Sequence, residues 1–228
     1  MDQSLDRSLD QSAIDARMME RCIALSAEAA QQHELPYACV ICCDGKVVAE
    51  AVNRVVEEGD VTRHAEILAI SAAQRVLGRS DLSDCTIYSN VEPCAMCAFP
   101  IRETRIGRVV YAISSPMMGG LSKWNVLGDN EISNVMPQVF GDAPEVAAGL
   151  LYRDAATVWR NWNPVFWLGI RFRGCLAEAP HDGAYRTLQS AAARRGVVAR
   201  LLASASRAIV RRRAARAPAQ PQARSTAI

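Results

Sequence analysis

The sequence has no run of apolar residues that approaches the ~20 needed to cross a bilayer as a helix. Residues 1–6 alternate polar and charged side chains and contain no apolar segment of the kind found at the centre of a secretory signal peptide. Internal repeats are also absent. From these absences we expect a soluble, cytoplasmic protein with no membrane span.

The sequence also lacks the context in which disulfides form, although it contains eight cysteines. A chain of 228 residues, half of them hydrophobic, can bury a core without disulfides, and no export signal is present. Cys39, Cys42 and Cys43 lie in an apolar run, where free cysteine behaves as a small hydrophobic residue. We expect the six cysteines outside the metal motif described below to be reduced and structural.

The net charge of +2 hides an asymmetry along the chain. Residues 176–228 carry a net charge of +8 and are rich in Ala, Arg, Ser, Pro and Gln, which leaves −6 for residues 1–175. We predict a flexible N-terminus over 1–14, a folded domain over 15–175, and a basic tail over 176–228 that is partly helical or disordered. The tail is a solvated extension without a defined role, an RNA-binding arm, or a segment that lies on anionic membranes.

Apolar periodicity predicts helices and strands in an alternating order. Strands that alternate with crossover helices indicate an α/β layered sheet with parallel segments. Residues 114–143, rich in Gly, Pro, Ser and Asn, are typical of a long functional loop. The expected elements are helix 15–32, strands 37–43 and 46–55 with a hairpin turn at Asp44-Gly45, helix 63–77, strand 86–89, helix 94–104, strand 108–113, strand 146–151 and helix 153–162.

Capping residues and prolines mark several of these boundaries. Thr62 is the expected N-cap of helix 63–77 and Gly78 its C-terminal stop. Pro100 is expected to shorten or kink helix 94–104, and Pro164 to end helix 153–162. The apolar segment 165–167 has no clear assignment.

Two short motifs carry the chemistry, His64-Ala65-Glu66 and Pro93-Cys94-Ala95-Met96-Cys97. Catalytic zinc takes three protein ligands from imidazole and thiolate groups and keeps a fourth position for water. Cys94 and Cys97, at i and i+3, share one helix face and can reach the ~3.8 Å separation of two sulfurs on a tetrahedral zinc. His64 supplies the third ligand, and Glu66 can carry protons between the activated water and a leaving group. The pattern predicts hydrolytic deamination.

Other interpretations of the motifs remain open at this point. A structural zinc usually takes four protein ligands, and Cys85 or Cys43 could supply the fourth. His33 and His181 stand outside any paired motif. A redox role for the two motif cysteines would leave the His64-Glu66 pair unexplained. The main rival is a non-catalytic binding module stabilised by zinc.

The motifs match the H-x-E…P-C-x-x-C signature of the zinc deaminases. The chain therefore resembles the cytidine deaminase superfamily, in its branch of guanine, cytosine and tRNA-adenosine deaminases, over about residues 15–165. The resemblance implies a three-layer α/β/α sandwich with a central five-stranded mixed sheet, and usually a homodimer. It also implies substrate contacts for Asn53, Ala65 and Pro93.

The substrate is less clearly indicated than the chemistry. In the tRNA-adenosine enzymes small residues follow the second cysteine, whereas this chain has Ala98-Phe99-Pro100 at that position. Those enzymes also have an Asp-x-Lys-x-Gly stretch after the fourth strand, where this chain has residues 114–120 with a different sequence. Residues 158–162 are similar to a Trp-Arg-Asn-Phe helix of guanine deaminases. We expect a nucleobase or nucleoside substrate, with guanine as the leading candidate and tRNA adenosine as the alternative. Trp124, in the long loop, is expected to stack on the base.

Overall fold

The computed structural model describes residues 2–179, and their side chains from residue 10 onward. A single mixed sheet lies at the centre, with its strands in the order β2-β1-β3-β4-β5. The strands are β1 (Ala38–Cys43), β2 (Lys46–Val52), β3 (Cys85–Val91), β4 (Arg108–Ile113) and β5 (Glu145–Ala148). The helices are α1 (Asp2–Gln31), α2 (Val55–Glu58), α3 (Ala65–Leu77), α4 (Ala95–Glu103), α5 (Asn130–Val135), α6 (Tyr152–Trp162) and α7 (Pro164–Phe172).

Pairing within the sheet changes direction once. Strand β1 pairs antiparallel with both β2 and β3, and the β3–β4 and β4–β5 pairs are parallel. Asp44 and Gly45 join β1 to β2 with φ of 48° and 72°. Two positive φ values are what a type I′ hairpin turn requires. The predicted hairpin and five-stranded mixed sheet are confirmed.

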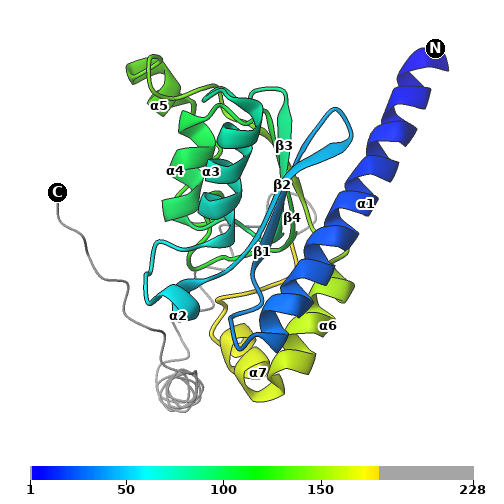
Figure 1. Cartoon of the computed structure of the whole chain (residues 1–228), viewed down its shortest axis with the longest axis vertical. Coiled ribbons are helices and arrows are strands. Elements are labelled where there is room, and N and C mark those ends of the chain that lie inside the picture. Colours follow the sequence, from blue (N-terminus) through cyan, green and yellow to red (C-terminus); the bar gives the residue numbers. More distant parts are fainter. Residues whose placement is uncertain (1, 180–228) are drawn as a thin grey trace.

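Helices cover both faces of this sheet, which gives three layers (Figure 1). Alternating strand residues point to opposite faces, so Val40 packs with α1 and α6 while Ile41 packs with α3 and α4. Trp159 of α6 is fully buried in the first of these two cores. Burial of one large apolar side chain contributes roughly 1.5–3 kcal/mol, so these paired cores hold the helices to the sheet. The predicted three-layer fold is confirmed.

Two helix starts differ from the sequence prediction. Helix α1 begins at Asp2 rather than at Asp15, so residues 2–14, expected to be flexible, are helical. No proline or glycine interrupts the chain between these points. The N-cap residue of α3 is His64 and not Thr62, whose hydroxyl instead donates to Asp60. Gly78 does end α3, with a φ of 65°.

Two boundaries near the end of the domain also differ. Pro164 ends α6 but at once begins α7, because Asn163 caps that helix by accepting from the Phe166 N–H. Ala177 pairs with Ser114 through two hydrogen bonds of 2.9 Å, so the domain extends past residue 175 to at least residue 179. The predictions for 180–228, including that for His181, lie outside the described residues.

The long segment 114–143 is an ordered insertion that contains α5. The buried side chain of Arg102, on α4, fixes its second half by donating four hydrogen bonds. Their acceptors are the carbonyls of Val126, Asp129 and Gly141 and the hydroxyl of Ser133. The eight cysteines all lie within the described residues, and none is in a disulfide. No helix in the described part of the chain is long and apolar enough to cross a membrane.

Candidate metal centre and substrate pocket

The metal centre lies where two helices begin, beside the C-terminal end of β3. His64 precedes α3 with φ −72° and ψ 146°, and Cys94 precedes α4 with φ −70° and ψ 172°. Cys97 is in the first turn of α4. Helix N-termini carry unpaired N–H groups and a partial positive charge. This placement therefore favours thiolates at both cysteines.

The three predicted ligands come together in the geometry of a zinc site. The Sγ atoms of Cys94 and Cys97 are 3.6 Å apart and lie 3.6 Å and 3.5 Å from Nδ1 of His64. Zinc bonds of ~2.3 Å to sulfur and ~2.0 Å to nitrogen give tetrahedral donor separations of roughly 3.8 Å and 3.5 Å. Within residues 2–179 this group has no fourth protein donor, since Cys43 and Cys85 belong to a different cluster.

The pKa shifts of Cys94 and Cys97 are also those expected of two adjacent thiols that bind a cation. A hydrogen bond from Cys97 and contact with His64 lower the pKa of Cys94 to about 4, although burial opposes the shift. The hydrogen bond with Cys94, together with burial, raises the pKa of Cys97. Without a cation, the second of two adjacent thiols resists ionisation because the first is already charged. A divalent cation between them removes that penalty, so the donor set fits zinc.

A pocket of about 180 Å³ opens beside these ligands. Its volume is below the ~300–1,000 Å³ typical of sites for drug-sized ligands, which favours a flat, single-ring or two-ring group. Glu66 is buried in its wall, and burial, followed by the charge of Cys94, raises the pKa of Glu66 to about 7. A carboxyl group with such a pKa can both accept and donate a proton near neutrality. The pocket is lined by Leu35, Tyr37, His64, Glu66, Val91, Glu92, Cys94, Ser115 and Met118.

A second buried carboxylate, Glu92, builds one wall of this pocket. It accepts hydrogen bonds from the backbone N–H groups of Ser115, Leu121 and Ser122, at 2.7 Å, 3.1 Å and 2.7 Å. The hydroxyl of Ser122 adds a fourth at 2.8 Å. Glu92 therefore holds the loop 114–122, which brings Ser115 and Met118 to the pocket.

Gly119 is required by the closeness of this packing. A Cβ atom at this position would overlap the Glu92 carboxylate. The next residue, Gly120, donates its N–H to the carbonyl of Pro93 at 2.7 Å, beside the ligand Cys94. The Gly119-Gly120 pair thus lets the loop lie directly against the ligand-bearing segment.

The sequence did not single out Glu92, Ser115 or Met118 as functional residues. Nothing in the local sequence around Glu92 reveals partners more than 20 residues away along the chain. Leu35 and Tyr37 enter the pocket from the segment before β1. That placement depends on the pairing of β1 with β3, which a local pattern does not specify.

The four predicted substrate-binding residues are not among those that line the pocket. Asn53 is buried and donates its side-chain amide to Glu34 at 2.8 Å. Ala65 is buried at the start of α3, and Pro93 uses its carbonyl to hold Gly120. Trp124 is 59% exposed and its ring lies 5.8 Å from Nζ of Lys123. The substrate roles of these residues stay predictions.

Comparison with known proteins identifies the family. The family described as "Cytidine and deoxycytidylate deaminase zinc-binding region" matches residues 12–113. A tRNA-specific adenosine deaminase of Agrobacterium fabrum is 32% identical over 144 residues, which are 63% of this chain and 90% of that protein. The chain belongs to this family of zinc-dependent deaminases. The predicted class of C–N hydrolase and the zinc cofactor are confirmed at the level of the family.

Further matches extend this likeness to longer proteins and to solved structures. A tRNA(Ile)-lysidine synthase of Deinococcus radiodurans is 35% identical over 63% of this chain, which spans only 23% of that longer protein. A structure from a study of A-to-I editing by tRNA:A34 deaminases is 32% identical with a TM-score of 0.56, covering 62% of this chain and 98% of the other. A variant of the protein NE0047 bound to 8-azaguanine is 26% identical with a TM-score of 0.56, covering 66% and 84%.

Proposed function

We propose that this chain is a zinc-dependent hydrolytic deaminase that acts on an adenosine in tRNA. The observation that carries the chemistry is the three-donor group, with separations of 3.5–3.6 Å, beside the buried carboxyl group of Glu66. A structural site has no need of a carboxyl group in the adjoining pocket. This arrangement therefore favours an enzyme over a non-catalytic module.

In this proposal the metal ligands, Glu66 and the loop held by Glu92 have separate roles in the reaction. Zinc held by His64, Cys94 and Cys97 supplies the Lewis acidity that makes water a nucleophile near neutral pH. Glu66 accepts a proton from the attacking water and delivers it to the departing amine. The loop held by Glu92 encloses the ring and keeps bulk water away from it.

Relatedness supports tRNA adenosine as the substrate. The tRNA-specific adenosine deaminase of A. fabrum and the tRNA:A34 deaminase structure are matched over 90% and 98% of their lengths. Both are more than 30% identical to this chain. This similarity outweighs the departures at 98–100 and 114–120, because those segments are short compared with the matched region.

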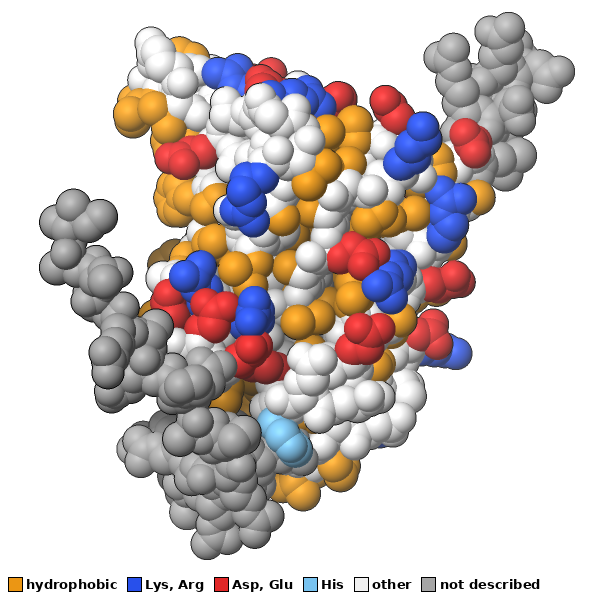
Figure 2. Space-filling model, viewed as in Figure 1, with side chains coloured by type: hydrophobic (Ala, Val, Ile, Leu, Met, Phe, Trp, Pro, Cys, Tyr) orange, Lys and Arg blue, Asp and Glu red, His pale blue; other side chains and the backbone are white. Residues whose placement is uncertain are grey.

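An RNA substrate requires positive charge near the pocket. The arginines beside His64 do not provide it, since Arg54 pairs with Glu57 and Glu58, and Arg63 pairs with Glu58 and Asp60. Figure 2 shows acidic and basic side chains side by side over this region near α2. In this proposal residues 176–228, with their net charge of +8, supply the contact with tRNA. A homodimer remains a prediction that native mass spectrometry would test.

A free purine base, such as guanine, is the second candidate. The NE0047 variant, 26% identical, binds 8-azaguanine, which has the size and shape of that base. The pocket volume of about 180 Å³ is also suited to a single base. In this alternative the basic tail has no part in catalysis.

A direct assay separates the candidates. The zinc-loaded full chain is incubated with bare tRNA or with free guanine, cytosine, adenine and their nucleosides, and ammonia and inosine are measured. We expect inosine in tRNA, and loss of that activity in Glu66→Gln with zinc retained. Turnover of guanine alone would establish the second candidate. No turnover of any substrate, with zinc bound, would favour the non-catalytic module.

A further inference from the structure

A second group of metal-binding side chains lies at the other end of the sheet. Cys43 is the last residue of β1 and Cys85 the first of β3, and the two are register partners in an antiparallel pair. Side chains that lie directly opposite each other in such a pair share one face of the sheet. Asp84 precedes Cys85 and completes the group.

The donor atoms of this group lie close together, with each sulfur next to a different oxygen of Asp84. Sγ of Cys43 is 3.5 Å from Oδ2 of Asp84, and Sγ of Cys85 is 3.6 Å from Oδ1. All three donors lie within 4.8 Å of one another. Zinc bonds of ~2.3 Å to sulfur and ~2.0–2.2 Å to a carboxylate oxygen give tetrahedral sulfur–oxygen separations of roughly 3.5 Å.

The charges of the group balance when a divalent cation is bound. Two thiolates and one carboxylate carry three negative charges, and the cation and the guanidinium of Arg79 carry three positive charges. Arg79 bonds both oxygens of Asp84, at 2.5 Å and 2.7 Å, and so acts as an outer partner of the ligand. The side chain of Asp84 is 48% exposed and Cys43 is half-buried, whereas Cys85 is only 1% exposed. An ion can therefore reach the group from solvent on the side of Asp84 and Cys43.

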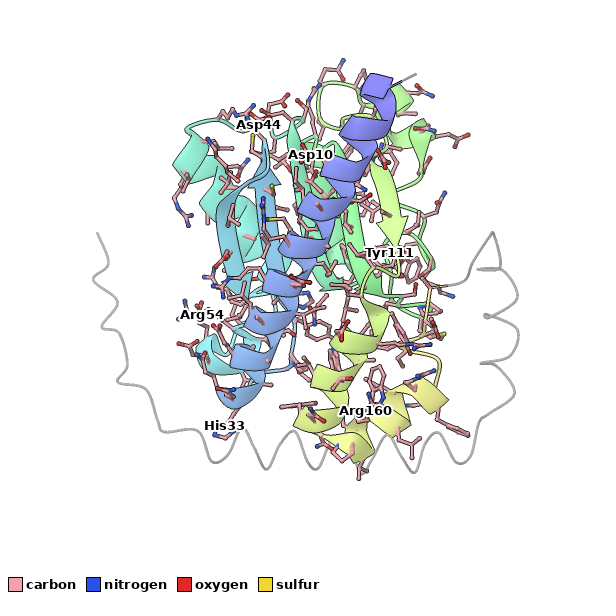
Figure 3. The ribbon with its side chains drawn as sticks, turned by 90° about the vertical axis from the view of Figure 1, so that its right-hand side faces the viewer. Asp10, His33, Asp44, Arg54, Tyr111 and Arg160 are labelled. Atoms are coloured by element: carbon pink, nitrogen blue, oxygen red, sulfur yellow. The ribbon has the colours of Figure 1, made fainter. Side chains whose placement is uncertain are left out.

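This group is separate from the catalytic centre. Strand β3 runs from Cys85 to Val91, beside the pocket, and at ~3.3 Å per residue its ends are about 20 Å apart. Figure 3 shows Asp44, the neighbour of Cys43, near the top of the view and Arg54 well below it. The backbone N–H of Arg54 bonds the carbonyl of Arg63, next to His64.

We propose that Cys43, Asp84 and Cys85 form a second zinc site, which fastens the end of β1 to the start of β3 and to the segment after α3. A cation there links the β1–β2 hairpin to Arg79 through Asp84. The three protein donors leave the fourth position of the ion to solvent, and the site takes no part in catalysis because the pocket residues lie at the far end of the sheet. The deamination reaction does not require it.

The zinc content of the purified, reduced full chain tests this site. We expect two zinc ions per chain in the wild type after equilibration with zinc and removal of loosely bound metal, and one in Cys43→Ser. We also expect deaminase turnover in Cys43→Ser to stay within twofold of the wild type. Cys42→Ala is the matched control, because Cys42 is the neighbouring thiol but faces the opposite core, and it should retain two.

A second measurement covers the case in which Cys43→Ser folds poorly. Cadmium replaces zinc and gives an ultraviolet charge-transfer absorbance that scales with the number of bound thiolates. We expect this absorbance to fall by half in Asp84→Asn combined with Cys43→Ala, and the second metal equivalent to raise the melting temperature only in the wild type. One zinc per chain in the wild type, equal content in Cys43→Ser, or a Cys43–Cys85 disulfide in place of metal would overturn the proposal.

Discussion

Replacement of Glu92 by glutamine tests whether this buried carboxylate holds the pocket wall in place. The carboxylate accepts four hydrogen bonds from the loop 114–122, two at each oxygen. Glutamine has one acceptor oxygen, so its amide NH₂ group would face one of these two pairs of donors. The shape of the side chain is nearly unchanged, and the variant therefore isolates the loss of acceptors.

The size of the expected effect on loop stability and on kcat/KM follows from the number of hydrogen bonds that Glu92→Gln removes. Hydrogen bonds to a charged acceptor contribute about 1.5–3 kcal/mol each, so losing two weakens the seating of the loop by about 3 kcal/mol or more. A factor of ten corresponds to ~1.4 kcal/mol, and we expect kcat/KM to fall roughly 100-fold if the loop must be seated for turnover. If the loop and the domain unfold together, the melting temperature falls by roughly 6–12 °C for a domain of this size.

The assay combines calorimetry, steady-state kinetics and zinc analysis on the same preparation. Glu103→Gln is the matched control, since it makes the same chemical change at an exposed position on α4 and should alter neither stability nor turnover. Ser122→Ala removes only the hydroxyl donor and should cost about 1.5–3 kcal/mol. A Glu92→Gln variant with a melting temperature within 1 °C of wild type (about the error of the measurement) and unchanged kcat/KM would refute the reasoning.

The remaining predictions concern other contacts. Gly119→Ala should lower kcat/KM at least tenfold with zinc retained, because its Cβ displaces the Glu92 carboxylate; equal turnover in the two proteins would contradict this. Cys94→Ser should lose the zinc of the catalytic centre together with turnover, as metal analysis would show. Asp15→Asn should destabilise the fold by about 3 kcal/mol at pH 7, because it breaks a largely buried ion pair with Arg108. Burial would raise the pKa of Asp15, but hydrogen bonds from Arg108, Tyr88 and Gln11 lower it overall. Its contribution is therefore complete above the unfolded pKa near ~3.9 and disappears as pH falls through the lower folded value, where urea titrations of the two proteins should converge.

Local signals in the sequence predicted most of the fold. Asp44-Gly45 fixed the hairpin because two positive φ values exclude most other residue pairs. Gly78 marked the end of α3 for the same steric reason. The start of α3 was placed wrongly, since Thr62 is the better N-cap by residue type but His64 takes the extended backbone at that position.

The metal ligands could be predicted because each motif is short and each helix start is local. The pocket wall could not, since Glu92 meets its partners 23 to 30 residues further along the chain. Asn53 shows a related limit: the family likeness predicts a substrate contact for it, and only the structure shows that its amide donates to Glu34. A side chain's partner depends on tertiary packing that neither periodicity nor motif specifies.

The pairing of Ser114 with Ala177 has a consequence for the pocket. Ser114 precedes Ser115, which lines the pocket and donates its hydroxyl to the carbonyl of Cys175 at 3.1 Å. The chain that leads to the basic tail is thus anchored to the same loop that Glu92 seats. The pocket wall therefore packs against residues from the end of the described chain as well as against Glu92.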